Sequence, residues 1–268
     1  GAAVAAVAVI AGVQLVAPTR PPPPKIVDLR HHNNTKSLNK PGQGGKAGTL
    51  PVIEFRDGPK PVKVIETDPN LFPIPGTELR LKVDHLPMMG SVEATHRIGL
   101  LFDYTCHDCR DFHGYMREAV KAFDGQLACM LIPMPLDAEC NPVVKETRST
   151  HVDACEYAKI CLAVHFSAPE KYEAFDRWLF SNQKQQKKLE VVRQHAARLV
   201  GADALEKALS GKAVQEQLRQ NVRAYKFTSE YAKNGSMPQS IIEGRVMYGA
   251  ADSVDQVKDG LKNILNLK

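Results

Sequence analysis

The chain has 268 residues, of which 43% are hydrophobic, so it can build the core of one large domain or of two small ones. Its formal net charge is +5, but residues 1–60 hold eight basic and three acidic residues, and the other 208 residues carry 27 of each sign. That balance, together with a single Trp, argues against a basic stripe interleaved with stacking aromatic side chains, so we expect no nucleic-acid partner.

The first 17 residues form an apolar segment. They contain no charge and one polar side chain, Gln14, which is typical of a helix inserted in a membrane. Because the segment has neither an initiator Met nor a basic leading region, we expect the remainder of a longer anchor helix. The alternative is a signal peptide, but a cut after Ala17 would place Leu15 at the −3 position, where a small residue is needed. Three basic residues follow and favour the cytoplasmic side, so the predicted orientation depends on the chemistry described below.

Residues 18–48 are rich in Pro, Gly, Asn and Lys. The four prolines at residues 21–24 favour an extended polyproline helix. The segment has too few apolar side chains to offset the entropy of ordering it. We therefore predict a flexible tether between the anchor and a folded domain that covers residues 49–268.

Short apolar runs in this domain predict strands. The runs are residues 50–55, 78–83, 97–103 and 126–133. Between the last two runs, apolar side chains from Cys109 to Phe123 recur at the spacing of a helix. The sequence therefore predicts a strand, a helix and a strand around the cysteine pair at residues 106–109.

A helical block follows. Residues 150–231 have almost no strand signal and are rich in Ala, Leu, Glu, Gln and Lys. Pro169, Gly201 and Gly211 divide the block into separate helices.

The end of the chain predicts a hairpin and a helix. Residues 239–248 form two short apolar runs joined by a turn, and Ser253 with Gln256 forms a capping box that starts the helix. Pro238 stands directly before the first run, where a Pro cannot donate a ladder hydrogen bond. A cis peptide bond after Met237 is one explanation, and an ordinary trans turn is the other.

Cys106 and Cys109 form a CxxC motif at the predicted junction of a strand and a helix. At a helix N-terminus, unpaired backbone N–H groups and the helix dipole favour a thiolate at Cys106. Cys109, one turn inside the helix, can attack a mixed disulfide on Cys106 and release the product. The pair therefore predicts a redox-active thiol-disulfide centre.

Other uses of the cysteines have less support. A zinc site would need a second close Cys pair or a His pair at ligand spacing, and the sequence offers neither, so we expect no metal. A cysteine hydrolase with His113 as its base would need an oxyanion site and a third orienting group that the sequence does not reveal. Cys140 and Cys155 flank a loop and predict a structural disulfide, with two unrelated thiols as the alternative.

The run from residue 99 to residue 110 resembles the active-site region of the bacterial Dsb-type thiol-disulfide oxidoreductases of the thioredoxin superfamily. The helical block, residues 235–238 (Gly-Ser-Met-Pro) before an apolar strand, and residues 85–91 before the CxxC strand are similar to the same family. The resemblance spans residues 79–268. It implies an α/β thioredoxin-like fold with a helical insertion between the βαβ half that carries the CxxC and a C-terminal ββα half.

By this resemblance Cys106 is the attacking thiol and Cys109 the resolving thiol. Pro238 is then a cis-proline beside them, and the Met237 backbone binds a substrate peptide in an extended pose.

The dipeptide between the cysteines, His107-Asp108, departs from the best-known members of this family. A His107 imidazolium would stabilise the Cys106 thiolate, whereas the Asp108 carboxylate would oppose it, so these redox-tuning residues act in opposite directions. The alternatives are a solvent-facing His107 and an Asp108 that only complements the helix dipole.

Together these features predict a periplasmic or otherwise extracytoplasmic oxidoreductase, tethered to the membrane by its N-terminal segment. We expect it to exchange disulfides with cysteine-containing proteins and to use a membrane-bound or soluble redox partner, without a metal or organic cofactor. The expected structural disulfide fits an oxidising compartment. The competing interpretation is a non-catalytic thioredoxin-fold subunit or peptide-binding module in a membrane-associated assembly.

Overall fold

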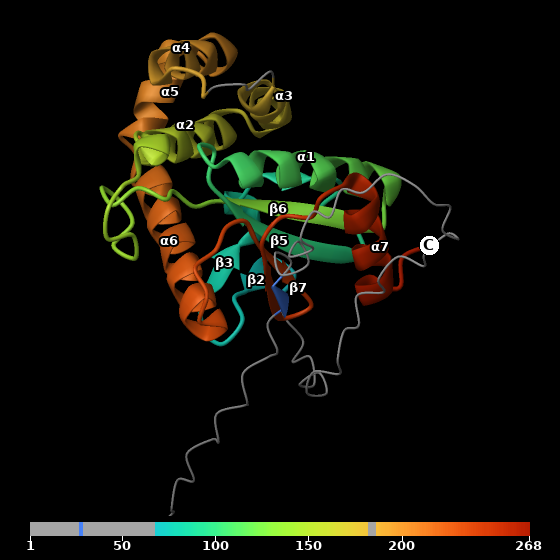
Figure 1. The fold of residues 1–268 in the computed structure, drawn as a ribbon. Helices are drawn as coiled ribbons and strands as arrows, with labels where there is room; N and C mark the ends of the chain where they lie inside the picture. Colours follow the sequence, from blue (N-terminus) through green and yellow to red (C-terminus); the bar gives the residue numbers. More distant parts are fainter. Residues whose placement is uncertain (1–26, 29–67, 182–185) are drawn as a thin grey trace, which may run out of the picture.

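The computed structural model of this chain describes residues 27–28, 68–181 and 186–268 (Figure 1). A six-stranded mixed sheet with the order β1-β8-β7-β5-β6-β4 forms its centre. The strands are β1 (Val27–Asp28), β4 (Met88–Met89), β5 (His96–Phe102), β6 (Leu127–Pro133), β7 (Gln239–Ile242) and β8 (Arg245–Tyr248). The predicted strands at residues 97–103 and 126–133 and the predicted hairpin are thus confirmed.

The pairing of β5 places the CxxC motif at one end of the sheet. β5 runs parallel to β6 and antiparallel to β7, and its register joins Leu101 to Ile132 on one side and to Gln239 on the other. Both β5 and β6 are nearly continuous apolar runs, as expected for strands covered on two faces. The start of β7 therefore lies at the end of β5 that leads into Cys106.

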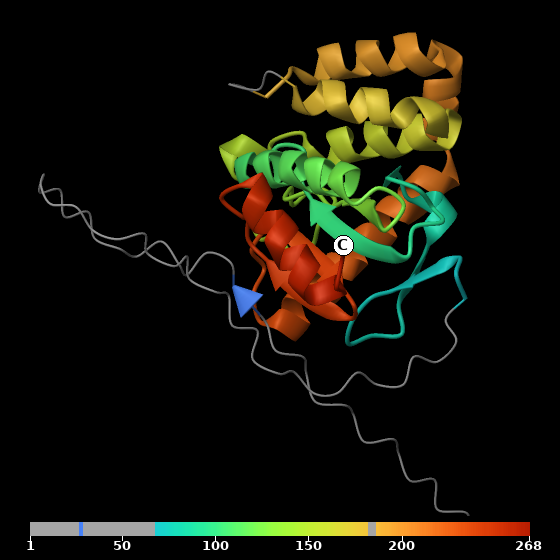
Figure 2. The same ribbon diagram turned by 90° about the vertical axis from the view of Figure 1, so that its right-hand side faces the viewer.

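Helices α1 (His107–Ala122) and α7 (Val254–Leu265) pack against each other on one face of the sheet (Figures 1 and 2). The buried side chains of α1 recur at the predicted helical spacing. They are Cys109, Phe112, His113, Met116, Ala119 and Val120. At the start of α7 the Ser253 hydroxyl accepts the Gln256 N–H at 3.2 Å, while the Gln256 side chain accepts the N–H of Asp252 at 2.7 Å. This is the predicted capping box, except that the Gln256 side chain accepts the N–H of Asp252 and not that of the N-cap residue Ser253.

Strands β2 (Leu71–Pro73) and β3 (Arg80–Lys82) form a separate two-stranded sheet. The strand predicted at residues 78–83 belongs to this sheet, and the short helix η1 (Val83–His85) ends it. Phe72 packs directly on β5 at Gly99, where a Cβ atom would come within 2.8 Å of the Phe72 ring. Gly99 therefore gives the second sheet room to approach the central one.

The predicted helical block is confirmed. Its elements are η2 (Ser149–His151), α2 (Ala154–Ser167), α3 (Pro169–Phe180), α4 (Leu189–Val200), α5 (Ala202–Leu209) and α6 (Lys212–Ala232). Pro169 opens α3, Gly201 separates α4 from α5, and Gly211 caps α6, as the three predicted breaks require. α2 contacts each of α3, α4, α5 and α6 and is buried around much of its circumference, so it is the central helix of the block.

The predicted anchor at residues 1–17, the strand at 50–55 and most of the tether lie outside the described residues. Within the tether, however, Val27–Asp28 forms β1 and pairs in parallel with Met247 and Tyr248 of β8. The prediction of a structureless tether is therefore wrong for these two residues. They include the second half of the β-branched pair Ile26-Val27, and β8 offers a sheet edge that can accept a short strand. Of the helices in the described ranges, none has the length and apolar character to cross a membrane.

Candidate active site

The two CxxC cysteines occupy the start of α1 as predicted. Cys106 is the N-cap residue, and its Sγ atom accepts the backbone N–H of Cys109 at 3.4 Å. Cys106 is partly exposed, whereas Cys109 is completely buried one turn further along. Neither cysteine is in a disulfide bond in this structure. One cysteine is therefore partly open to solvent at the helix N-terminus, and the other is buried behind it.

The surroundings of the two thiols separate their pKa values. Hydrogen bonds from the Cys109 thiol and from the Cys109 backbone N–H lower the pKa of Cys106, and together they outweigh burial and the charges of Asp103 and Asp108, which raise it. Burial, followed by the interaction with Cys106, holds the pKa of Cys109 well above its usual value. Cys106 is thus the better nucleophile and leaving group, and the Cys109 thiol keeps its proton more strongly.

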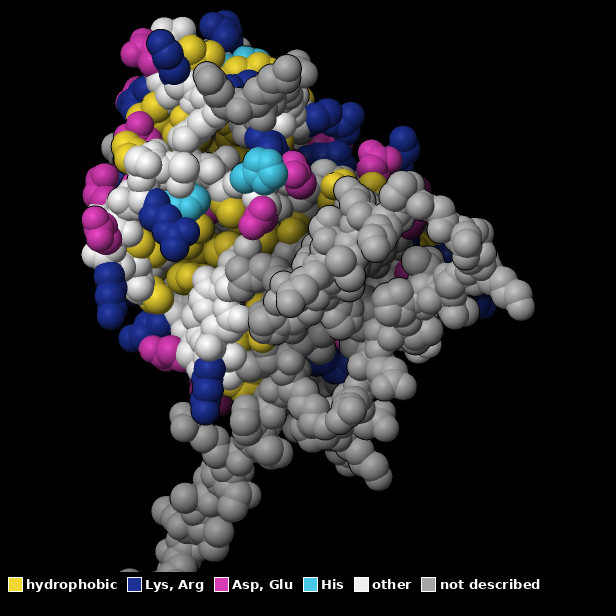
Figure 3. All heavy atoms as spheres, viewed as in Figure 1, with side chains coloured by type: hydrophobic (Ala, Val, Ile, Leu, Met, Phe, Trp, Pro, Cys, Tyr) yellow, Lys and Arg dark blue, Asp and Glu magenta, His cyan; other side chains and the backbone are white. Residues whose placement is uncertain are grey.

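The dipeptide His107-Asp108 lies in solvent at the first turn of α1, with both side chains more than half exposed. The imidazole is 3.5 Å from the Asp108 carboxylate and 3.8 Å from that of Asp111. Figure 3 shows a histidine and acidic side chains together over the region of α1, above a band of hydrophobic side chains. The imidazole thus has two carboxylates within ion-pair distance in solvent.

The Met237–Pro238 peptide bond is cis. Because Leu101 pairs with Gln239, these two residues lie at the end of the sheet where β5 leads into Cys106. The Pro238 carbonyl accepts the N–H of Gly249 at 2.9 Å, and the Met237 side chain is buried. The fold thus brings Met237-Pro238 and the CxxC, which are distant in sequence, to the same end of the sheet.

Helix α6 holds in place the loop that carries Met237 and Pro238. This role of α6 was not evident from sequence patterns. The Tyr225 hydroxyl donates to the Gly235 carbonyl at 2.7 Å, and the Gln239 amide bridges Thr228 and Ser229 of α6 at 2.5 and 3.2 Å. Burial raises the pKa of Tyr225, and the charge of a Cys109 thiolate contributes to the same shift. The helical insertion therefore contacts the active site through α6.

A buried polar cluster joins α1 to α3. Asp176 is 1% exposed and accepts the Tyr104 hydroxyl at 2.9 Å, while Arg117 forms an ion pair with its other oxygen. His113 Nε2 lies 3.4 Å from the same carboxylate, and the Tyr172 hydroxyl lies 2.6 Å from that of Tyr104. His113 faces this cluster in the protein interior.

Cys140 and Cys155 are joined by a disulfide bond, with 6.0 Å between their Cα atoms. The bond closes the loop that leads from β6 to α2. This loop also reaches the active-site turn, because the Leu136 N–H donates to the Asp103 carboxylate at 2.6 Å. The disulfide therefore stabilises a segment in contact with the residues just before Cys106.

Replacing both Cys140 and Cys155 by Ser should lower the free energy of unfolding by about 3 kcal/mol, because the unfolded chain regains the entropy of a 15-residue loop. Denaturant unfolding of the variant and of the wild type, without reductant, measures the difference. Mass spectrometry of alkylated protein isolated without reductant is the control. Free thiols at both positions would contradict the expectation of a disulfide.

The other two cysteines, Cys129 and Cys161, are completely buried, and burial raises the pKa of each thiol. They pack as small apolar side chains. Within the three described ranges, no three His, Cys, Asp or Glu side chains are grouped so that they could hold a metal ion.

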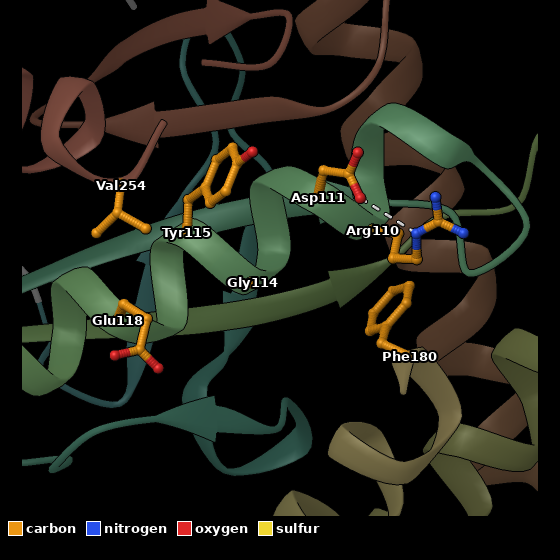
Figure 4. A pocket seen from close by; sticks show the side chains of 7 residues that line it. All are labelled: Arg110, Asp111, Gly114, Tyr115, Glu118, Phe180 and Val254. Carbon is orange, nitrogen blue, oxygen red and sulfur yellow. Dashed lines mark hydrogen bonds and ion pairs between the residues drawn. The ribbon is translucent and has the colours of Figure 1, made fainter. Parts of the chain in front are cut away.

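A shallow groove of about 490 Å³ follows the exposed side of α1 directly after the CxxC. Its lining residues are Arg110, Asp111, Gly114, Tyr115, Glu118, Phe180 and Val254 (Figure 4). The Arg110 side chain donates to Asp111 at 3.2 Å. Apart from its chain neighbours and the backbone of its own helix, no atom of the described residues lies within 4 Å of where a Cβ would stand on Gly114. The groove thus combines charged and aromatic walls with a floor that has no side chain.

Comparison with solved structures finds similar folds that cover most of the described domain. A periplasmic thioredoxin-like protein from Salmonella enterica serovar Typhimurium is 16% identical, with a TM-score of 0.52 over 68% of this chain and 91% of the other. A thioredoxin-like oxidoreductase from Silicibacter pomeroyi is 19% identical, with a TM-score of 0.52 over 69% and 94% of the two chains. The thiol-disulfide exchange protein alpha-DsbA2 from Wolbachia pipientis is 20% identical, with a TM-score of 0.51 over 66% and 86%.

Neither the comparison with protein families nor the comparison with curated proteins gives a match. At 16–20% identity the structural likeness establishes the fold. The chain has the thioredoxin-like fold of Dsb-type proteins, with the helical insertion that the sequence predicted.

Proposed function

We propose that this protein is an extracytoplasmic thiol-disulfide oxidoreductase that exchanges disulfides with cysteine-containing proteins. The observation that carries the proposal is the asymmetry of the CxxC pair. Cys106 is partly exposed at the N-terminus of α1 with a lowered pKa, while Cys109 is buried one turn behind it with a raised pKa. Two-step thiol exchange needs this difference between an attacking and a resolving sulfur.

In the oxidising direction, a substrate thiolate attacks the Cys106 sulfur of a Cys106–Cys109 disulfide. The S–S bond breaks, its electron pair passes to Cys109, and Cys109 takes up a proton. A second substrate thiolate then attacks the substrate sulfur of the mixed disulfide, and Cys106 leaves as a thiolate. The substrate loses two electrons and the centre gains two, and the reverse sequence reduces a substrate disulfide.

Two surfaces next to Cys106 suit an extended substrate. The backbone at Met237, before Pro238, lies at the same sheet end as the CxxC and supplies a site for β-like pairing. The groove along α1 begins at Arg110, the residue that follows Cys109. We propose that the substrate chain crosses Cys106 between these two surfaces.

The proposed location outside the cytoplasm is supported by the Cys140–Cys155 disulfide, since such bonds persist in oxidising compartments. The apolar run at residues 1–17 supports a membrane tether. A membrane-bound or soluble redox partner would then restore the starting state of the CxxC after each cycle.

An insulin-reduction assay and a peptide-thiol oxidation assay test the proposal. We expect the purified wild-type protein to turn over in at least one of them, and titration against glutathione buffers then gives the direction of electron flow. A correctly folded wild-type protein without turnover in either assay would refute the proposal.

A further inference from the structure

A buried carboxylate lies just before the attacking cysteine. Asp103 is 2% exposed, and its backbone carbonyl accepts the N–H of Cys106 at 3.1 Å. One carboxylate oxygen accepts the N–H and the hydroxyl of Thr105 at 2.6 and 2.7 Å, and the other accepts the N–H of Leu136 at 2.6 Å. Three donors thus hold a carboxylate in an interior position where its charge acts on the CxxC.

The charge of Asp103 acts on both sulfurs of the centre. Its Coulomb interaction contributes to raising the pKa of Cys106 and the pKa of Cys109. The other carboxylate that opposes the Cys106 thiolate, Asp108, is more than half exposed, so solvent screens its charge more than that of Asp103.

A histidine from the helical insertion completes the arrangement. His151 of η2 places Nδ1 at 2.8 Å from the Thr105 hydroxyl and at 3.8 Å from the Asp103 carboxylate, and its side chain is 12% exposed. Thr105 has one hydroxyl proton, which it donates to Asp103 while that carboxylate is ionised. His151 Nδ1 must therefore carry a proton and donate to Thr105.

We propose that Asp103, Thr105 and His151 form a tuning chain for the CxxC, in which the Asp103 charge disfavours the Cys106 thiolate and His151 offsets that charge through Thr105. The inference rests on the proposed function, because it takes Cys106 as the attacking thiol. His151 is a positioning residue, since its side chain contacts Thr105 and Asp103 and acts on Cys106 through them. Along its own segment, the charged neighbours of His151 are Arg148 and Asp153.

Thiolate titration of Cys106, by absorbance or by the pH dependence of its alkylation, tests the proposal together with the equilibrium against glutathione. In Asp103→Asn we expect a lower pKa of Cys106 and an equilibrium shifted about tenfold toward the dithiol form, equivalent to one pKa unit. In His151→Gln we expect shifts of opposite sign and smaller size, about threefold. His96→Gln, at the far end of β5, is the matched control and should change neither quantity.

A double variant gives the decisive comparison. If His151 acts through Asp103, adding His151→Gln to Asp103→Asn should produce no further shift. If Asp103→Asn does not fold, Thr105→Val removes only the linking hydroxyl, and His151→Gln should then be silent in that background. An equal effect of His151→Gln in every background, or no effect in the wild type, would overturn the proposal. The titration needs no substrate, so protein that shows the coupling but no turnover would refute the proposed function alone.

Discussion

Replacing Cys106 by Ser should reduce disulfide exchange to the uncatalysed rate, whereas replacing Cys109 by Ser should stop the reaction halfway. A Ser hydroxyl at position 106 neither ionises at neutral pH nor forms a disulfide, so no mixed intermediate can form. In Cys109→Ser the partly exposed Cys106 still reacts with a substrate disulfide, but no second thiol releases the product. The first variant is therefore inactive, and the second accumulates a mixed disulfide.

Non-reducing electrophoresis and mass spectrometry of each variant, incubated with a disulfide-containing peptide, separate the two outcomes. The adduct should map to Cys106 in Cys109→Ser and should be absent in Cys106→Ser. Cys129→Ala is the control, because this thiol is completely buried in β6 and should not contribute to exchange. An adduct on Cys109 in Cys106→Ser at the wild-type rate would contradict the assigned roles.

The parts of the fold that follow local rules were predictable from sequence. The CxxC lies at a helix start because the apolar spacing of α1 begins there, and Ser253 caps α7 through a bond to a residue three positions away. Pro169 and Gly201 end or begin helices because of their backbone conformations. Such features depend on a few neighbouring residues, so a pattern in the sequence is sufficient to find them.

The polar contacts of the site depend on tertiary packing and were not predictable. Thr105 and His151 are separated by 46 residues, and Tyr104 and Asp176 by 72 residues. A lone His or Asp in an amphipathic segment looks the same whether it faces solvent or a buried partner. Only the packing of η2 and α3 against the start of α1 gives these side chains their partners.

The strands also differ in how well the sequence predicts them. β5 and β6 are seven-residue strands with long apolar runs and were predicted, whereas β2 and β1 consist of three and two residues. Short strands carry little periodicity, and they are defined by the sheet edge to which they bind. Residues 27–28 pair with β8 although the surrounding composition favours disorder.

Asp176→Ala should lower the free energy of unfolding by about 3–5 kcal/mol, the effect expected when one partner of a buried ion pair is removed. The carboxylate is 1% exposed, accepts hydrogen bonds from Tyr104 and Arg117, and lies 3.4 Å from His113 Nε2. Its removal leaves the buried Tyr104 hydroxyl without this acceptor, and Arg117 and His113 without the neighbouring negative charge, at the contact between α1 and α3. Glu173→Ala is the matched control, because Glu173 lies on the same helix and also contacts Arg117, but is 63% exposed. We expect that control to lose less than about 1 kcal/mol.

The pH dependence of unfolding gives an independent measurement of the same interaction. Burial raises the pKa of Asp176. The interactions with His113, Arg117 and Tyr104 together lower this pKa by more than burial raises it, so the pKa in the folded state lies below its usual value. A carboxyl group with a depressed folded-state pKa stabilises the protein above its unfolded pKa of about 4, and this contribution is lost as the pH falls toward the folded value. The stability difference between wild type and Asp176→Ala should therefore be largest near neutral pH and should shrink below about pH 4. A difference that stays constant down to pH 2 would mean that Asp176 stabilises the contact between α1 and α3 by packing and not by its charge.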